Sequence, residues 1–276
     1  MQRLSLVDES FDLNFINEYI LSIQVSLDGF SFSILDAVSN KIICLYHQDT
    51  FTTEPGFHLK KISTIYNEVD LLTFPYKETR IFFSAPDKTT LVPIAVFSPE
   101  LAEDFYRLTL APARNSKILC SFLPGMGSWA VFEVDRTVHS LLEERHAGAF
   151  MQSDLVLSGL GCPEEKTAIR VKVLRKNLVI QTLHDQTNFY NSFYYEGEND
   201  MLYYILGTAQ NMNLKPDLII LDGMVNRHES IYHRLRQYFE HVEIAKANPH
   251  VRYSDLLRQL PDARFTNLFN SFSYKF

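Results

Sequence analysis

One order of predicted secondary structure occurs twice in this chain of 276 residues, over 20–110 and again over 167–245. Each repeat begins with three short strands joined by tight turns, continues with an amphipathic helix and a further strand, and ends with a second helix. Strands are predicted where apolar and polar residues alternate, and helices where apolar residues recur at i, i+3, i+4 and i+7. The repeats share no matching residue identities, so the repetition is one of element order. It predicts an α/β protein built from two related lobes.

The first repeat opens with alternating apolar and polar residues at 21–27, which predict a strand. Asp28-Gly29 then predicts a tight hairpin, because this pair tolerates the positive φ that primed turns require. The other elements predicted for this repeat are strands at 30–34, 41–46 and 79–85, a helix over 62–69, an extended piece at 90–97 and a helix beginning at Ser98-Pro99.

The second repeat contains a continuous apolar run at 217–221, which is typical of a central parallel strand covered on both faces. In its first strand, at 169–173, apolar residues alternate with Arg170 and Lys172. The other elements predicted here are strands at 178–183, 187–195 and 241–245, a helix beginning near Asp200 and a helix containing Ile231 and Leu235.

The residues between the repeats predict two strands, at 117–122 and 129–135, then a helix around Val138 and a strand at 154–157. We therefore expect three parts. Residues 1–114 form the first lobe, 115–165 an inserted subdomain that completes it, and 166–276 the second lobe. The last fifteen residues carry four Phe and one Tyr, too apolar for a free terminus, so we expect this tail to dock, by default on its own lobe.

Charge and composition limit the partners and the compartment. Acidic residues outnumber Lys and Arg by 33 to 26, a net charge of −7, which argues against a nucleic-acid partner. The chain has no apolar run of about 18 residues, so no membrane span is expected. Acids in the first fifteen residues argue against a signal peptide, and three widely spaced cysteines fit a reducing compartment. The expected location is the cytoplasm.

The doubled order βββαβα resembles the ribonuclease-H-like unit that occurs twice in the actin-like ATPase superfamily, which includes actin, hexokinase and the sugar kinases. Leu21–Asp36 resembles the hairpin that cradles phosphates in that superfamily, and Asp217–Val225 resembles its adenosine segment. The block 115–165 is similar to an extra subdomain of actin-like proteins from bacterial cell division, pilus assembly and secretion. Thr89–Tyr106, with the whole element order, resembles a bacterial family of unknown function described as having an actin-like ATPase fold.

The resemblance implies a nucleotide cleft between the lobes, with Mg-ATP as the cofactor that such a cleft would hold. The residues at the matching positions are Gln24, Ser26, Asp28, Gly29, Asp222 and Gly223. Two of them depart from the superfamily pattern, because Gln24 stands where an acid is usual and Ser26 where a glycine is usual. A neutral amide is a poor ligand for Mg²⁺. The second hairpin, Val173–Asn177, lacks the Asp and Gly that let backbone amides approach a phosphate.

These departures predict a degenerate actin-like protein, with no catalytic residues, no metal and no bound cofactor, that works as a scaffold or regulator for a protein partner. The rival hypothesis is an ATPase or small-molecule kinase whose metal is held by Asp28, Asp185 or Asp222. Asp28 is also a preferred turn residue, and Asp222-Gly223 is equally consistent with a bare turn. A nuclease would need an acid at position 24.

A helical metal site is not expected. His139, Glu143 and His146 share one predicted face, but ligands at i and i+7 lie about 10 Å apart, too far for one ion.

Overall fold

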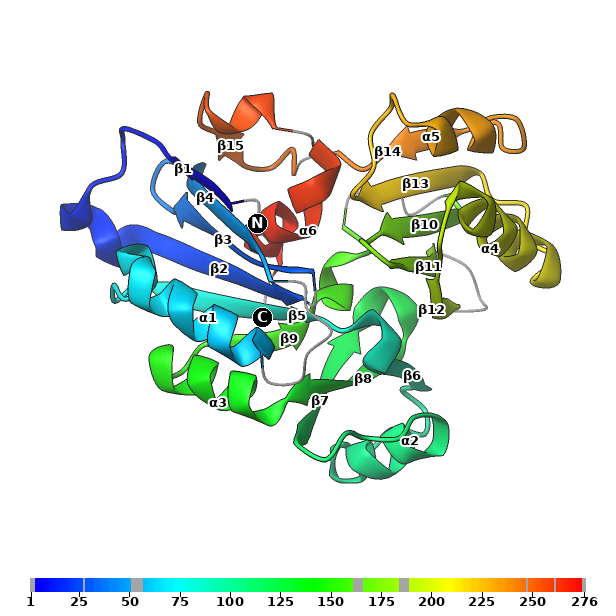
Figure 1. The fold of residues 1–276 in the computed structure, drawn as a ribbon, viewed down its shortest axis with the longest axis horizontal. Coiled ribbons are helices and arrows are strands. Elements are labelled where there is room, and N and C mark those ends of the chain that lie inside the picture. Colours follow the sequence, from blue (N-terminus) through cyan, green and yellow to red (C-terminus); the bar gives the residue numbers. More distant parts are fainter. Residues whose placement is uncertain are drawn as a thin grey trace.

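The computed structural model describes residues 3–26, 28–50, 57–160, 166–183, 189–246, 248–260 and 262–274. These residues form two lobes, each built on its own sheet, and a smaller sheet below the first lobe (Figure 1). The predicted two-lobed α/β fold is therefore confirmed. Asp185 and the start of the strand predicted at 187–195 lie outside the described residues.

The first lobe is a sheet of seven strands with the order β1-β4-β3-β2-β5-β9, in which β15 also pairs with β4. Its strands are β1 (Arg3–Val7), β2 (Tyr19–Ser26), β3 (Gly29–Asp36), β4 (Lys41–Asp49), β5 (Glu78–Ser84), β9 (Phe150–Ser153) and β15 (Arg252–Tyr253). The central strand β2 is antiparallel to β3 and parallel to β5. Helices α1 (Phe57–Glu68) and α3 (Arg136–Arg145) cover one face, where the alternating apolar residues of β2 and β3 form a continuous core with them.

The second lobe repeats this order with a sheet of five strands, β12-β11-β10-β13-β14. Its elements are β10 (Ala168–Val173), β11 (Asn177–Leu183), β12 (Tyr190–Tyr194), β13 (Leu218–Gly223), β14 (Val242–Ile244), α4 (Glu198–Asn211) and α5 (Ser230–Leu235). The apolar run at 217–221 becomes β13, which lies parallel between β10 and β14 as predicted. Both helices pack on one face of this sheet, and its other face is turned toward the first lobe (Figure 1).

A third sheet of three strands, in the order β6-β8-β7, lies below the first lobe with α2 packed on it. Its elements are β6 (Thr89–Pro93), β7 (Ser116–Leu123), β8 (Ser128–Asp135) and α2 (Ala102–Thr109). The strand predicted at 154–157 was wrong, because these residues form a 3-10 turn and the strand is β9, which precedes them and pairs with β5. The domain boundaries after residues 114 and 165 stay a prediction.

The C-terminal tail crosses to the first lobe. Helix α6 (Thr266–Asn270) and Phe265 pack against Leu35, Ile42 and Leu45 on the face of the first sheet opposite α1. Docking on its own lobe, the second, was the default expectation, and it holds only for the start of the tail, where Ala263 belongs to the core of the second lobe. The meander β2-β3-β4 carries apolar side chains on both faces, and the aromatic tail covers the face that helices α1 and α3 leave open.

The tight hairpin between β2 and β3 is confirmed, but its geometry differs from the predicted one. Gly29 is the first residue of β3, and neither Asp28 nor Gly29 has a positive φ. A Cβ on Gly29 would lie 2.7 Å from Cε1 of His47 and 3.2 Å from the backbone oxygen of Gln48. The glycine is therefore required by the close approach of β4.

The described part of the chain contains no helix long and apolar enough to cross a membrane.

Of the three residues expected on one face of α3, His139 and His146 are buried and Glu143 is exposed. Nε2 of His146 lies 2.8 Å from the Tyr66 hydroxyl, beneath α1. His139 is buried between Lys117, whose Nζ lies 3.2 Å from Nε2, and Glu143, whose carboxylate lies 3.6 Å from Nδ1. Burial, with a smaller contribution from the charge of Arg145, lowers the pKa of His146 to about 4.

This histidine should make the fold sensitive to acid. Its pKa in an unfolded chain is about 6.5, so below that pH the unfolded state binds a proton that the folded state does not. We expect His146 to reduce the free energy of unfolding by about 2 kcal/mol between pH 7.5 and pH 5. Urea unfolding at both pH values, with His146→Gln as the comparison, separates it from His47, His58 and His139, whose pKa values are also lowered. An unchanged pH dependence in His146→Gln would contradict the assignment.

Candidate functional site

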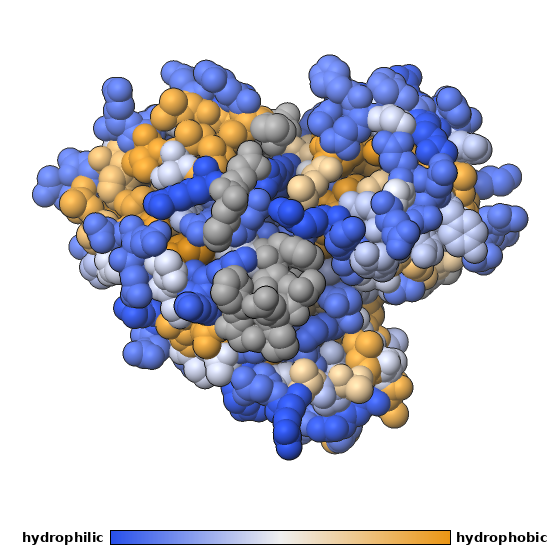
Figure 2. Space-filling view, in the orientation of Figure 1, coloured by the Kyte–Doolittle hydropathy of each residue, from blue (hydrophilic) through white to orange (hydrophobic). Residues whose placement is uncertain are grey.

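The predicted phosphate hairpin and the end of β13 face each other across the junction of the lobes. Gln24, Ser26, Asp28 and Gly29 line a space of about 60 Å³ together with Gly223. The structure thus brings five of the six predicted residues together, and we call this space the hairpin cleft. Figure 2 shows strongly hydrophilic side chains gathered at the junction of the two lobes on this face.

Charged groups from the second lobe and from the tail close the hairpin cleft. The backbone N–H of Arg175 donates to Oδ2 of Asp28 over 2.9 Å, and the Arg175 guanidinium lies 3.2 Å from Oδ2 of Asp49. Arg264, just before α6, lies 3.5 Å from the other carboxylate oxygen of Asp49. Two acids of the first lobe are therefore held by cations and amides that come from elsewhere in the chain.

His47 and Asp49 form the electrostatic centre of this closure. Nε2 of His47 lies 3.0 Å from Oδ1 of Asp49 and 2.8 Å from Nη2 of Arg264, while Nδ1 lies 2.8 Å from the Ser31 hydroxyl. Burial and the Arg264 charge lower the pKa of His47. Burial alone would raise the pKa of Asp49, but the hydrogen bond with His47 and the neighbouring positive charges lower it overall. Asp49 is thus held ionised in its pair with the arginines.

Lys172 bridges the lobes deeper in the junction. Its Nζ lies 2.5 Å from Oδ2 of Asp154 and 3.4 Å from the Ser84 hydroxyl at the end of β5. Asn267 of α6 donates to the same carboxylate oxygen over 3.3 Å. Side chains from three separate segments therefore meet around one partly buried lysine, and the space left between them is about 20 Å³.

Asp222, the sixth predicted residue, lines this smaller space and not the hairpin cleft. Oδ2 accepts from Nη2 and Nε of Arg170 over 2.8 and 3.1 Å, and Oδ1 accepts from the Gly223 N–H over 2.7 Å. Asp222 is 2% exposed and Arg170 is 4% exposed. Both carboxylate oxygens are therefore occupied inside the protein.

The hairpin itself is held by Ser26, which stands where a glycine is usual in the superfamily. Its hydroxyl donates to the Gly29 carbonyl and accepts from the Gly29 N–H, each over 3.0 Å. This N–H is one that a phosphate-cradling hairpin would turn toward its ligand. Gln24 lines the cleft beside it, and its side chain makes no hydrogen bond to another described residue.

The space between the hairpins is small in this arrangement. Pockets for small ligands enclose about 300–1,000 Å³, several times the volume between these hairpins. Within the described ranges, no group of three or more His, Cys, Asp or Glu side chains is placed to hold a metal ion. In this arrangement the charged residues of the junction bind the two lobes to each other.

Sequence reasoning missed most of the residues that form the charge pairs at the lobe junction. Lys172 and Arg170 alternate with apolar residues in β10, a pattern that also fits a solvated strand face. Asp49 lies beyond the predicted end of its strand, and Arg264 lies in a tail expected elsewhere. A fold-level prediction of which strand face meets the other lobe could have found Lys172, because β10 and β2 occupy matching places in the two repeats.

Two lobes built on the same order of strands, facing each other across a cleft, define the class of protein with an actin-like ATPase fold. The chain superposes on a Bacteroides thetaiotaomicron protein of that fold and of unknown function with a TM-score of 0.74 and 22% identity, over 85% of this chain and 93% of that one. The chain belongs to the DUF3822 family of proteins of unknown function, whose family model matches residues 8–242. The resemblance inferred from the sequence is thereby confirmed.

Two other solved structures share the fold. One is the PilM–PilN type IV pilus biogenesis complex, with a TM-score of 0.60 and 11% identity over 91% of this chain and 96% of that chain. The other is the cytoplasmic domain of EpsL, an inner membrane component of the type II secretion system of Vibrio cholerae, with a TM-score of 0.50 and 12% identity over 94% and 96%. No functionally curated protein matches this sequence.

Proposed function

We propose that this protein is a non-catalytic binding protein, a scaffold or regulator in the cytoplasm, that keeps the actin-like ATPase fold without turning over ATP. The observation that carries the proposal is the hairpin cleft, which is closed by charge pairs and encloses about 60 Å³. Phosphoryl transfer needs room for the phosphates, a free carboxylate for Mg²⁺ and hairpin amides that point at the phosphates. None of these is offered by the described residues of the cleft.

The four acids described at the junction already have partners. Asp28 accepts from the Arg175 N–H, Asp49 pairs with Arg175 and Arg264, and Asp154 pairs with Lys172. Asp222 is paired with Arg170 away from the cleft. A metal-bound nucleotide would have to break these contacts and separate the lobes before it could bind, and that cost would weaken its affinity.

A protein partner fits this proposal better than a small substrate. The fold occurs in a chain of the PilM–PilN type IV pilus biogenesis complex and in the cytoplasmic domain of EpsL, a component of a secretion system. A pair of lobes fastened through Asp49 and Lys172 presents a fixed surface, which suits a scaffold. The rival, an ATPase or kinase that uses Asp28 or Asp222, requires an opened cleft in which those carboxylates exchange their present partners for a metal.

Titration with Mg-ATP should therefore produce almost no stabilisation. With 1 mM ligand and a Kd of about 1 mM, the gain is about 0.4 kcal/mol, or roughly one degree in Tm. An ATPase with micromolar affinity would gain about 4 kcal/mol under the same conditions. Thermal shift and calorimetry with ATP and ADP, with and without Mg²⁺, make the measurement. We expect Gln24→Asp to behave in the same way, because the Ser26 hydroxyl and the Arg175 turn still occupy the cradle.

Two variants distinguish a nucleotide site that is present but closed from a cleft that has no nucleotide site. Arg175→Gln removes one charge pair of the closure and leaves the candidate residues in place, so it should also fail to bind Mg-ATP. Micromolar Mg-ATP binding with phosphate release, lost in Asp28→Asn, would replace the binding-protein proposal with the ATPase. Asp222→Ala does not serve here, since it removes the partner of a buried arginine.

A further inference from the structure

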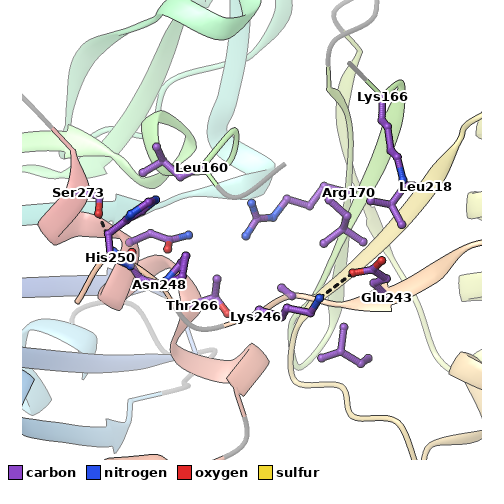
Figure 3. Close-up of a pocket in the computed structure, with 15 residues that line it drawn as sticks. Leu160, Lys166, Arg170, Leu218, Glu243, Lys246, Asn248, His250, Thr266 and Ser273 are labelled. Atoms are coloured by element: carbon purple, nitrogen blue, oxygen red, sulfur yellow. Dashed lines mark hydrogen bonds and ion pairs between the residues drawn. The ribbon is translucent and has the colours of Figure 1, made fainter. Parts of the chain in front are cut away.

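A second cavity lies behind the hairpin cleft, between the inner face of the second sheet and the C-terminal region. It encloses about 430 Å³, within the range of small-molecule sites. Figure 3 shows its two walls, with Arg170, Leu218 and Glu243 from the second sheet on one side, and Asn248 and Ser273 on the other. We call this space the sheet cavity. Its lining shares only Arg170 with the spaces at the junction described above.

The sheet side of this cavity is apolar. Leu218, Ile220 and Ala245 belong to the buried cluster on the face of the second sheet opposite α4 and α5, and all three also line the cavity. The helices that cover the sheet lie on its other face, and α6 of the tail packs chiefly on the first sheet. The space that remains beside this apolar surface suits a ligand with a hydrocarbon or aromatic body.

The charged groups around the cavity are mainly cationic. Lys166, Arg170 and Lys246 line it together with His250, against a single acid, Glu243. Glu243 lies 3.3 Å from Nζ of Lys246, and Arg170 is bound by Asp222. Lys166 has no ion pair with a described residue. Since the other two cations are paired, Lys166 supplies the excess positive charge of the lining, and in a chain whose net charge is −7 this favours an anionic ligand.

One polar side chain of the cavity lining is open to the cavity and makes no hydrogen bond to a described residue. Asn270, the last residue of α6, is 5% exposed and lines the cavity, yet its amide makes no hydrogen bond to another described residue. The neighbouring Asn248 shows the usual state of such a group, because it donates to the Phe269 carbonyl and the Ser273 hydroxyl and accepts from the His250 N–H. The buried side-chain atoms that lack a partner do not include this amide, so it is open to the cavity, where a ligand acceptor can take its hydrogen bond.

We propose that the sheet cavity binds a small organic anion with an apolar body, such as a medium-chain carboxylate. The apolar body lies against Leu218, Ile220 and Ala245, and the acidic head accepts a hydrogen bond from the Asn270 amide in the field of the surrounding cations. The site is independent of the proposed function, since it is separate from the hairpin cleft and requires neither nucleotide nor metal.

Isothermal titration of the whole chain with decanoate, and with decyltrimethylammonium as its cationic counterpart, tests the site. We expect one decanoate to bind per chain, with affinity falling as salt rises, and no saturable binding of the cation. Asn270→Leu should weaken decanoate binding about tenfold, because a hydrogen bond to a charged group is lost. It should leave Tm unchanged or raised, since that amide bonds no described residue.

Lys246→Glu supplies a second test at an exposed position, where folding is not at risk. It should weaken decanoate binding several-fold, whereas Lys215→Glu, an exposed lysine outside the cavity, should leave it unchanged. If Asn270→Leu fails to fold, the decanoate affinities of Lys246→Glu and Lys215→Glu are compared to test the proposal. Equal binding of decanoate and the cation, equal losses in the two lysine variants, or a folded Asn270→Leu that binds like the wild type would each overturn the proposal.

Discussion

Asp222→Ala should lower the free energy of unfolding by about 3–5 kcal/mol. Asp222 supplies the carboxylate that faces Arg170, and both residues are almost fully buried between the sheets. Removing the acid leaves an almost fully buried guanidinium whose other acceptors among the described residues are the Ser158 carbonyl and the Asn267 amide oxygen, 3.5 Å away. An uncompensated buried charge costs far more than the pair contributes. Urea unfolding, followed by circular dichroism, measures the loss.

Two comparisons make this expectation specific. Asp255→Ala removes the acid of an exposed pair with Arg258 and should cost less than about 0.5 kcal/mol. The double variant Arg170→Met with Asp222→Leu replaces the pair by apolar side chains and should recover most of the loss, since replacing a whole buried pair is often neutral. A cost below about 1 kcal/mol for Asp222→Ala would show that the arginine finds other partners or water.

The order of the elements was predictable because each one has a local cause. Alternation identified β2, β3 and β10 from their own residues, and the unbroken apolar run identified β13 as a central strand. The mistake at 154–157 has the same origin. Those residues are all buried, as a strand would be, but they turn the chain so that Asp154 meets Lys172, a contact with a residue 18 positions away that no local pattern encodes.

The location of the hairpin cleft was predictable, and its closure was not. Strand ends that match between the repeats meet at the junction, which placed Gln24, Asp28 and Gly223 correctly around one space. The groups that close it come from distant segments, such as Asp49 with Arg264. The local sequence around a charged residue does not show which residue it will pair with. The path of the tail decides this pairing, and that path depends on which sheet face the two lobes leave uncovered.

The sheet cavity also results from the path of the C-terminal tail. Because α6 packs chiefly on the first sheet, the inner face of the second sheet around Leu218 and Ile220 is only partly covered. The tail thus lines the hairpin cleft through Arg264 and the smaller space around Lys172 through Asn267, and it borders the sheet cavity through Thr266 and Asn270. The phosphate motifs are missing at the hairpins, and the Asn270 amide at the sheet cavity bonds no described residue. A small ligand is therefore expected in the sheet cavity and not in the hairpin cleft.

Gly223→Ala should destabilise the fold by about 3 kcal/mol. Gly223 ends β13 with φ = 82°, a region where an L side chain costs about 1–2 kcal/mol. A Cβ there would also lie 2.3 Å from the Val173 carbonyl oxygen, which accepts the Met224 N–H over 2.8 Å. β10 and β13 would have to separate where the two hairpins meet. Gly207→Ala is the matched control, because Gly207 lies inside α4 with open space at its Cβ position, and it should stabilise the fold by about 0.5–1 kcal/mol. Thermal and urea unfolding of the two variants should therefore shift in opposite directions, and a Gly223→Ala protein as stable as the wild type would refute the strained turn.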